Sequence, residues 1–394
     1  MLKQPIKKIL EKITSEHQRM TVTEGEILLN SPHLAEIASA ADTVCRHMHP
    51  EPWRTYNIDR NINYTNICQC RCYFCAFSRD AHHADAYVIT KDELLQKIQQ
   101  TVDLGGSQIL LQGGLNPELR LSWFEQLFRE IKSAFPGVNI HGLTPTEILF
   151  LSKLENLPEE TVLDRLASAG LGSLPGGGAE ILVDSVRKKI SPKKIMTEDW
   201  LRIHELWHLR GGRSTATMMF GHVETPAERM KHLEHIRNLQ DKTGGFTAFI
   251  PWTYQPVPRA IFENFSPDKI SHKDFSHTDF LSAPPKKTEM DMSRIPAAGT
   301  FAYLKMLAVS RLFLDNISNI QVSWVTQGMK IGELALSFGA NDMGSLMIEE
   351  NVVAACGTTF FTTETQLKEN IRRAGFLPRR RNVFYQLQDF ISDE

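Results

Sequence analysis

The sequence predicts an α/β protein folded as a (β/α)8 TIM-like barrel with helical extensions at both ends. From about residue 60, eight short apolar or β-branched runs follow one another, each separated from the next by a turn and a stretch with helical periodicity. Alternating strands and helices indicate a parallel sheet. Eight repeats over about 290 residues fit a closed barrel better than a doubly wound sheet, which is the weaker alternative.

The eight predicted strands follow in chain order, at residues 62–66, 107–114, 139–145, 171–177, 214–221, 245–252, 320–328 and 338–345. The helices between them have recognisable starts, because Thr90 and Thr197 each precede acidic residues and can cap a first turn. Pro158 suits the first turn of another helix, where its missing N–H is not needed. In a barrel of this kind the chemistry lies where the strands end. The expected rim residues are Gln112–Gly114, His141–Glu147, Pro175–Glu180, Gly221–Glu224, Trp252–Gln255, Thr326–Gln327 and Asn341–Asp342.

Three regions are expected along the chain. Residues 1–56 form an N-terminal helical extension, 57–355 the barrel, and 356–394 a C-terminal helical extension. Residues 259–296 form a long irregular insertion after the sixth strand, which we interpret as a lid or binding loop. The Arg379–Arg381 run is interpreted as a solvated surface patch.

Composition favours a small-molecule partner. Among 394 residues, 42% are hydrophobic, and the formal charge of −2 gives no electrostatic reason to expect nucleic acid or an anionic membrane. No apolar run approaches the ~18 residues of a membrane span, and the first residues lack the pattern of a secretory signal. The crowded cysteines do not resemble a secreted disulfide framework, so a reducing cytoplasm is the expected compartment.

Four of the six cysteines lie within residues 68–75, directly after the first predicted strand. Cys68, Cys72 and Cys75 could each hold one iron of a four-iron cube and leave the fourth iron without a protein ligand. A closed zinc site completed by Cys70, His82 or His83 fits the spacing equally well, and a redox pair of Cys72 and Cys75 fits less well. The position of the loop at the catalytic rim favours the cluster.

The spacing CxxxCxxC, with an aromatic residue before the last cysteine, resembles the radical S-adenosylmethionine (SAM) superfamily. The resemblance implies that Cys68, Cys72 and Cys75 bind a [4Fe-4S] cluster and that S-adenosyl-L-methionine chelates its open iron. It gives Cys70 no role. The residues that it implies for SAM binding are Phe74, Gly113, Gly114, Glu180 and Gly221.

Longer segments of the sequence indicate one family within this superfamily. "DRNINYTNIC", "HGLTPTEI", "LPGGGAEILVDSVRKKISPKK", "ATMMFGHVETPAERMKHL", "FIPWTYQP" and "LALSFGANDMGSLMIEENVV" resemble the cyclic dehypoxanthine futalosine synthase family of the futalosine route to menaquinone. The resemblance implies that a 5′-deoxyadenosyl radical removes the C4′ hydrogen of the ribose in dehypoxanthine futalosine. The carbon radical then adds to the aromatic ring, and a spirocyclic product forms after loss of a proton and an electron. A reducing partner such as flavodoxin or ferredoxin is also implied.

Two alternatives remain open at this point. A sister radical SAM enzyme, either aminofutalosine synthase or the deazaflavin-precursor synthase, would share most of these segments. A protein of another class, a zinc-stapled barrel that only binds its partner, would share the cysteines. Several rim side chains could accept the final proton, namely His141, His222, Glu147 and Asp342, and the sequence does not choose among them.

Overall fold

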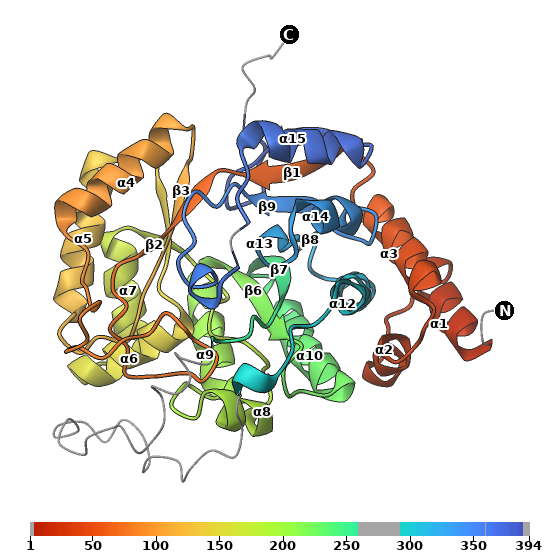
Figure 1. The fold of residues 1–394 in the computed structure, drawn as a ribbon, viewed down its shortest axis with the longest axis horizontal. Helices are drawn as coiled ribbons and strands as arrows, with labels where there is room; N and C mark the ends of the chain where they lie inside the picture. Colours follow the sequence, from red (N-terminus) through yellow and green to blue (C-terminus); the bar gives the residue numbers. More distant parts are fainter. Residues whose placement is uncertain (1–3, 259–291, 359, 389–394) are drawn as a thin grey trace.

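A curled parallel sheet forms the centre of the computed structural model, which describes residues 4–258, 292–358 and 360–388 (Figure 1). Its seven strands pair in chain order, each parallel to the next. The strands are β2 (Asp59–Asn63), β3 (Gln108–Gln112), β4 (Asn139–Gly142), β5 (Leu171–Leu174), β6 (Arg213–Phe220), β7 (Phe246–Thr253) and β8 (Asn319–Ile320). A parallel sheet whose strands alternate with helices matches the predicted fold class.

Backbone contacts close this sheet into a ring. After β8, Gln321 bridges in parallel to Asp342, the first residue of β9 (Asp342–Ser345). Strand β9 pairs with β1 (Trp53–Asn57), and β1 continues directly into β2. The first and last members of the barrel therefore meet, and the TIM-like barrel is confirmed. The eighth predicted strand, however, belongs to a separate three-stranded sheet in the order β10-β1-β9, with β10 at Leu377–Arg380.

The seventh predicted strand is much shorter than its apolar run. The run 320–328 contributes only Ile320 to β8, and the chain then turns into helix α13 (Trp324–Gln327). The turn is stabilised because the N–H of Ser323 donates to the hydroxyl of Tyr303, 2.8 Å away, instead of to a neighbouring strand. A buried apolar run alone does not distinguish a strand from a short helix.

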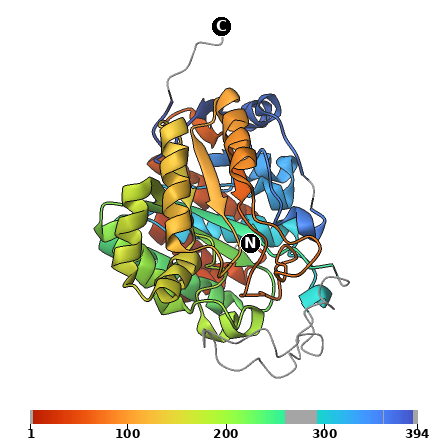
Figure 2. The ribbon, with the colours of Figure 1, turned by 90° about the vertical axis from the view of Figure 1, so that its left-hand side faces the viewer.

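Helices cover the outside of the barrel (Figures 1 and 2). They are α4 (Lys91–Asp103), α5 (Leu121–Ala134), α6 (Pro145–Glu155), α7 (Glu159–Ala169), α8 (Asp184–Ile190), α9 (Thr197–Leu209), α10 (Pro226–Thr243), α12 (Thr300–Phe313) and α14 (Met329–Ala335). Thr90 caps α4 as predicted, because its side chain accepts from the N–H of Glu93. Thr197 is instead the first residue of α9, and Met196 precedes it at the cap position.

The N-terminal region packs against one side of the barrel. Helices α1 (Gln4–Thr14), α2 (Val22–Leu29) and α3 (Leu34–Met48) lie next to α10 and α12 (Figure 1). The C-terminal region contains helix α15 (Glu364–Arg373) but also strand β10, which pairs in parallel with β1, so it is not purely helical. Most of the predicted insertion, 259–291, lies outside the described residues. No helix of the described part is long and apolar enough to cross a membrane.

The prediction of a solvated Arg379–Arg381 patch is wrong for Arg381. Only 4% of Arg381 is exposed, and it forms two hydrogen bonds to the buried carboxylate of Asp342, at 2.5 and 2.8 Å. The backbone N–H of Arg381 also donates to the carbonyl of Tyr56 at the end of β1. Strand β10 thus directs one arginine of the run inward, where its charge is neutralised.

Candidate active site

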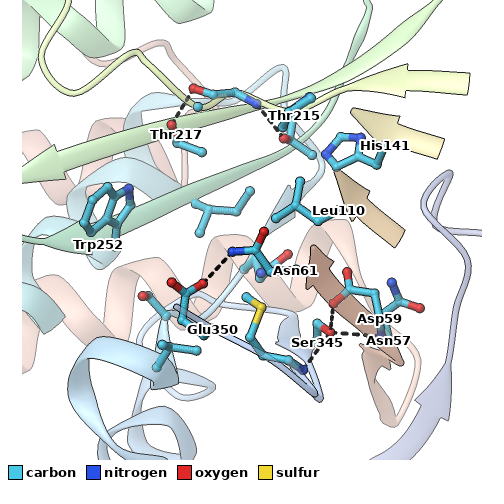
Figure 3. A pocket seen from close by; sticks show the side chains of 18 of the residues that line it. Asn57, Asp59, Asn61, Leu110, His141, Thr215, Thr217, Trp252, Ser345 and Glu350 are labelled. Carbon is cyan, nitrogen blue, oxygen red and sulfur yellow. Dashed lines mark hydrogen bonds between the residues drawn. The ribbon is translucent and has the colours of Figure 1, made fainter. Parts of the chain in front are cut away.

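The barrel encloses a cavity of about 260 Å³ (Figure 3). One end is lined by Asp59 and Gln108, the first residues of β2 and β3, and the other by residues at or beyond the strand ends, including Trp252 and Glu350. Most of the polar lining is neutral: Asn57, Asn61, Gln108, Gln112, Thr215, Thr217, Gln321, Ser323 and Thr326. Such a surface can orient a small polar molecule by hydrogen bonds.

Several predicted rim residues line this cavity. They are Gln112, His141, Pro175, Gly176, Gly177, Gly178, Glu180, Trp252 and Thr326. Asn57 at the end of β1 and Asp59 and Asn61 of β2 also line the cavity, and they were not predicted from the sequence. Their alternation along "NIDRNIN" was the available signal, because every second residue of a strand faces the same side. Glu350, Arg381 and Tyr385 were also missed, and they come from segments that sequence periodicity did not assign to the barrel.

The four cysteines of residues 68–75 lie together in a compact loop. Cys70 and Cys72 are buried against Leu115 and Phe150, with Cys68, Phe74 and Cys75 packed around them. The loop is fixed by backbone hydrogen bonds, from Cys68 to Arg79, from Gln69 to Leu115 and from Tyr73 to Ile190. These bonds fix the backbone positions from which the thiol side chains project.

The environment of the loop affects the cysteines differently. A hydrogen bond from the Cys70 thiol, together with backbone N–H groups of Leu115, Cys70 and Arg71, lowers the pKa of Cys68 to about 6. The same contact with Cys68 raises the pKa of Cys70 well above its usual range. Burial raises the pKa of Cys75 to about 12. Because the thiolate is the form that binds metal, the lowered pKa favours metal binding by Cys68.

A closed zinc site is not favoured by the geometry. In the ranges that the structure describes, no group of three or more His, Cys, Asp or Glu side chains is arranged to hold one metal ion. His82 and His83 are exposed, and Nδ1 of His83 accepts from the N–H of Asp85. A zinc ion requires its ligands to converge on one point, whereas the thiolates of an iron–sulfur cube each bind a different iron. Three cysteines on one compact loop, without a convergent set of four ligands among the described residues, fit the cluster better.

Glu180 connects this loop to the cavity. It lines the cavity, is 5% exposed, and adopts a left-handed backbone conformation with φ 39°, which is costly for a residue other than glycine. Its Oε1 lies 2.8 Å from Lys194 Nζ, while Oε2 has no hydrogen-bond partner. Lys194 in turn lies 5.6 Å from the ring centre of Phe74 in the cysteine loop. A buried carboxylate oxygen that lacks a hydrogen-bond partner, next to the loop, fits a polar ligand such as SAM.

The two predicted glycines after β3 pack closely against the start of the cysteine loop. A Cβ on Gly114 would lie within 2.8 Å of Cys68 Cβ and even closer to the carbonyl of Ile67, and a Cβ on Gly113 would lie 2.7 Å from the ring of Tyr64. The N–H of Gly113 donates to Glu147, and that of Gly114 to the carbonyl of Thr65. Glycine is therefore needed here for packing, independently of any ligand.

Gly221 directly follows β6 and has a left-handed conformation with φ 89°. A Cβ there would collide with Ala298, and the N–H of Gly221 donates to Glu224 at 2.6 Å. Burial of Glu224 opposes ionisation, but hydrogen bonds and the charges of His222 and Arg229 lower its pKa to about 2. His222 and Glu224 thus fix the turn after β6 and do not line the cavity.

Two further candidate bases have structural partners. Glu147 accepts hydrogen bonds from the Tyr64 hydroxyl and from the N–H groups of Gly113 and Thr144, and it does not line the cavity. Asp342 accepts hydrogen bonds from the side chains of Arg381 and Thr55.

His141 does line the cavity, but it is hydrogen-bonded to Ser173. Burial lowers its pKa to about 3, so its neutral imidazole is a weak base.

Comparison with known proteins identifies the family of this chain. Residues 62–236 match the model of the radical SAM superfamily, and residues 286–393 match the CofH/MqnC C-terminal region. Cyclic dehypoxanthine futalosine synthase of Halalkalibacterium halodurans is 39% identical over 94% of this chain and 92% of its own length. The 5-amino-6-(D-ribitylamino)uracil–L-tyrosine 4-hydroxyphenyl transferase of Methanothermobacter thermautotrophicus is 36% identical over 98% of both chains. Aminodeoxyfutalosine synthase of Streptomyces coelicolor is 34% identical over 97% of this chain and 94% of its own length.

A solved structure supports the fold. The crystal structure of methylornithine synthase covers 94% of this chain and 97% of its own length with a TM-score of 0.65, at 16% identity. At that identity the likeness concerns the fold alone. The chain is therefore an enzyme of the radical SAM superfamily, which uses a [4Fe-4S] cluster and S-adenosylmethionine, and it belongs to the branch that contains the cyclic dehypoxanthine futalosine synthases and their sister enzymes.

Proposed function

We propose that this protein is a cyclase that converts dehypoxanthine futalosine to cyclic dehypoxanthine futalosine in menaquinone biosynthesis. The relative with that name is 39% identical, against 36% and 34% for the two sister enzymes compared above. The observation that carries the proposal is the contact chain from the cysteine loop through Lys194 to Glu180 at a cavity lined mainly by neutral hydrogen-bonding groups. Such a cavity suits a sugar with an aryl substituent.

In this proposal the cofactors are held by residues around the loop. Cys68, Cys72 and Cys75 bind the cluster, and SAM is contacted by Phe74, Gly113, Gly114, Glu180 and Gly221. When bound, these cofactors supply the 5′-deoxyadenosyl radical that removes the C4′ hydrogen of the ribose. We further propose a cytoplasmic location and flavodoxin or ferredoxin as the electron donor.

The chain's own residues then have two tasks. The first is positioning, because the C4′ hydrogen must be presented in one orientation, and the wall of amide and hydroxyl groups from β2, β3, β6 and the segment after β8 provides hydrogen bonds for this. The second is exclusion of water and other hydrogen donors, which the apolar lining from Leu110, Ile250 and Val353 supports.

The test is a comparison of substrates. Reconstituted enzyme is incubated without oxygen, with reductant and SAM, and separately with dehypoxanthine futalosine and with 5-amino-6-(D-ribitylamino)uracil plus tyrosine. Mass analysis is expected to detect a cyclised product only from the first mixture. A coupled product from the second mixture, with none from the first, would instead assign the chain to the transferase function of its sister.

A further inference from the structure

We propose that Glu350 and Asn61 form a binding site for hydroxyl groups of the substrate's sugar. The two residues come from distant parts of the chain, Asn61 from β2 and Glu350 from the segment after β9, and both line the cavity (Figure 3). The amide Nδ2 of Asn61 donates to Oε2 of Glu350 at 2.8 Å. This inference rests on the proposed function and specifies how its substrate is held.

The hydrogen bonds of Glu350 leave it with one free acceptor position. Its Oε1 accepts from the N–H groups of Val352 and Val353, at 2.7 and 2.9 Å, and its Oε2 accepts only from Asn61. Each carboxylate oxygen has two lone pairs, so Oε1 is saturated and Oε2 can accept once more. Three N–H donors around the group also show that both oxygens act as acceptors.

Asn61 adds a second acceptor beside the first. A carboxylate accepts hydrogen bonds, so the group that faces Glu350 must be the amide nitrogen, and Oδ1 is then the free end. Asn61 is 1% exposed, and its buried Oδ1 has no hydrogen-bond partner in the described structure. An unpaired buried acceptor carries a free-energy cost that a ligand donor removes.

The pair therefore presents two acceptors to the cavity. Two acceptors on neighbouring side chains match a ligand with hydroxyl donors on adjacent carbons, as in a pentose or a pentitol chain. Trp252 lies toward the same end of the cavity on its other side (Figure 3). An aromatic face there can pack against the ring of the sugar or its aryl group.

The other two carboxylates that line the cavity are less suited to this role. Asp59 accepts from the side chains of Ser345 and Gln108 at the opposite end. Glu180 is paired with Lys194, and it lies beside the cysteine loop, where SAM is proposed to bind. Glu350 is the remaining carboxylate among the cavity residues that the structure describes.

Glu349 provides a matched control. It is the neighbouring glutamate, but it does not line the cavity and instead pairs with Lys97 at 2.7 Å and with Arg60 at 3.7 Å. Glu349→Gln therefore removes the same charge one residue away without changing the cavity. Asn61→Ala is a second variant that removes the amide acceptor and leaves Glu350 in place.

The experiment measures equilibrium dissociation constants on the intact reconstituted enzyme with SAM, without oxygen and without reductant, so that no turnover occurs. The ligands are dehypoxanthine futalosine and its analogues that each lack one ring hydroxyl. Glu350→Gln and Asn61→Ala are expected to weaken binding of the full ligand by about 10–100-fold, with Glu349→Gln unchanged. One of the analogues lacks the hydroxyl group that the pair binds, and the wild-type enzyme should bind it about 10–100-fold more weakly than the full ligand. Glu350→Gln should then weaken binding of this analogue little further, because the contact is already absent.

Two results would overturn the inference. In the first, Glu350→Gln and Asn61→Ala bind the full ligand as tightly as wild type. In the second, the loss of affinity from the substitution multiplies the loss from the missing hydroxyl for every analogue, so that no hydroxyl contacts the pair. If wild type binds 5-amino-6-(D-ribitylamino)uracil and not dehypoxanthine futalosine, the proposed function fails. The same variants measured with the ribityl compound, which also carries adjacent hydroxyls, then still decide whether Glu350 and Asn61 bind them. Binding of neither compound to wild type contradicts both proposals.

Discussion

Lys194 and Glu180 form a buried ion pair, with Lys194 Nζ 2.8 Å from Glu180 Oε1. Burial alone would lower the pKa of Lys194, but the Glu180 carboxylate and the nearby Cys72 and Cys70 raise it above its ordinary value. The lysine therefore stays charged between the cavity and the cysteine loop. It binds Oε1, while Oε2 has no hydrogen-bond partner and can accept a hydrogen bond from a ligand.

The first prediction concerns this pair. Glu180→Gln is expected to weaken SAM binding by about 10–100-fold, because a hydrogen bond to a charged acceptor is lost. Lys194→Met is expected to lower the free energy of unfolding by about 3 kcal/mol, because it leaves a buried carboxylate with only the more distant Arg187, 3.6 Å away. Anaerobic equilibrium binding and urea unfolding measure the two effects. Glu234→Gln, in a partly exposed pair with Lys231, is the control, and normal SAM affinity in Glu180→Gln would refute the assignment.

The second prediction separates the four cysteines. Cys68→Ser, Cys72→Ser and Cys75→Ser should each lose most of the iron and the brown absorption after anaerobic reconstitution, because each thiolate holds one iron. Cys70→Ser should retain about four irons per chain, as the wild type does. Iron analysis and visible absorption provide the readout. Loss of iron in Cys70→Ser equal to that in Cys72→Ser would favour a four-cysteine site and contradict the proposed ligand set.

The third prediction concerns the support of the loop. Gly114→Ala should reduce cluster incorporation, because the new methyl group would collide with the Ile67 carbonyl and Cys68 Cβ. Gly137→Ala is the matched control, since a Cβ at that position has no neighbour within 4 Å. Iron content per folded chain is the measurement. Equal iron content in the two variants would mean that the loop can move away from β3 without losing the cluster site.

The fourth prediction is an acid sensitivity that arises from the buried histidine His232. His232 is fully buried, and its Nδ1 accepts from the N–H of Leu182 at 2.9 Å. Burial, with the charges of His235 and Arg187, lowers its pKa to about 3. The unfolded chain protonates this histidine below about pH 6.5, whereas the folded chain resists protonation down to about pH 3. Its contribution to stability is therefore complete above about pH 6.5 and is lost as the pH falls.

Between pH 6.5 and pH 5 this single histidine should reduce the free energy of unfolding by about 2 kcal/mol. His232→Asn keeps an acceptor for Leu182 but cannot take up a proton. Its free energy of unfolding, measured with urea, should therefore decrease less between pH 7 and pH 5 than that of wild type. His82→Gln changes an exposed histidine, and its free energy of unfolding should decrease between pH 7 and pH 5 as much as that of wild type. An identical pH dependence in His232→Asn would show that the buried imidazole does not limit acid stability.

The barrel could be predicted from the sequence because its signals are local. Apolar runs, turns and capped helices such as the one that begins after Thr90 repeat along the chain, and each element can be recognised within a few residues. The cysteine loop was also predictable in position, because all four cysteines lie within eight residues.

The cavity was harder to predict because it combines side chains from distant segments. Asn61 and Glu350 are 289 positions apart and meet only when the ring closes between β9 and the junction of β1 and β2. Arg381 appeared to belong to a surface run, and only the pairing of β10 with β1 directs it inward to Asp342. After the short β8, the N–H of Ser323 donates to Tyr303, a contact between segments 20 residues apart that no local pattern encodes.

The central claim is tested most directly by following one hydrogen atom. Dehypoxanthine futalosine carrying deuterium at C4′ is incubated with the reconstituted enzyme, reductant and SAM, and the 5′-deoxyadenosine that forms is analysed by mass spectrometry. The proposed function predicts that the deuterium appears in 5′-deoxyadenosine while the cyclised product loses it. Unlabelled 5′-deoxyadenosine, together with a product that keeps its deuterium, would contradict the proposed function.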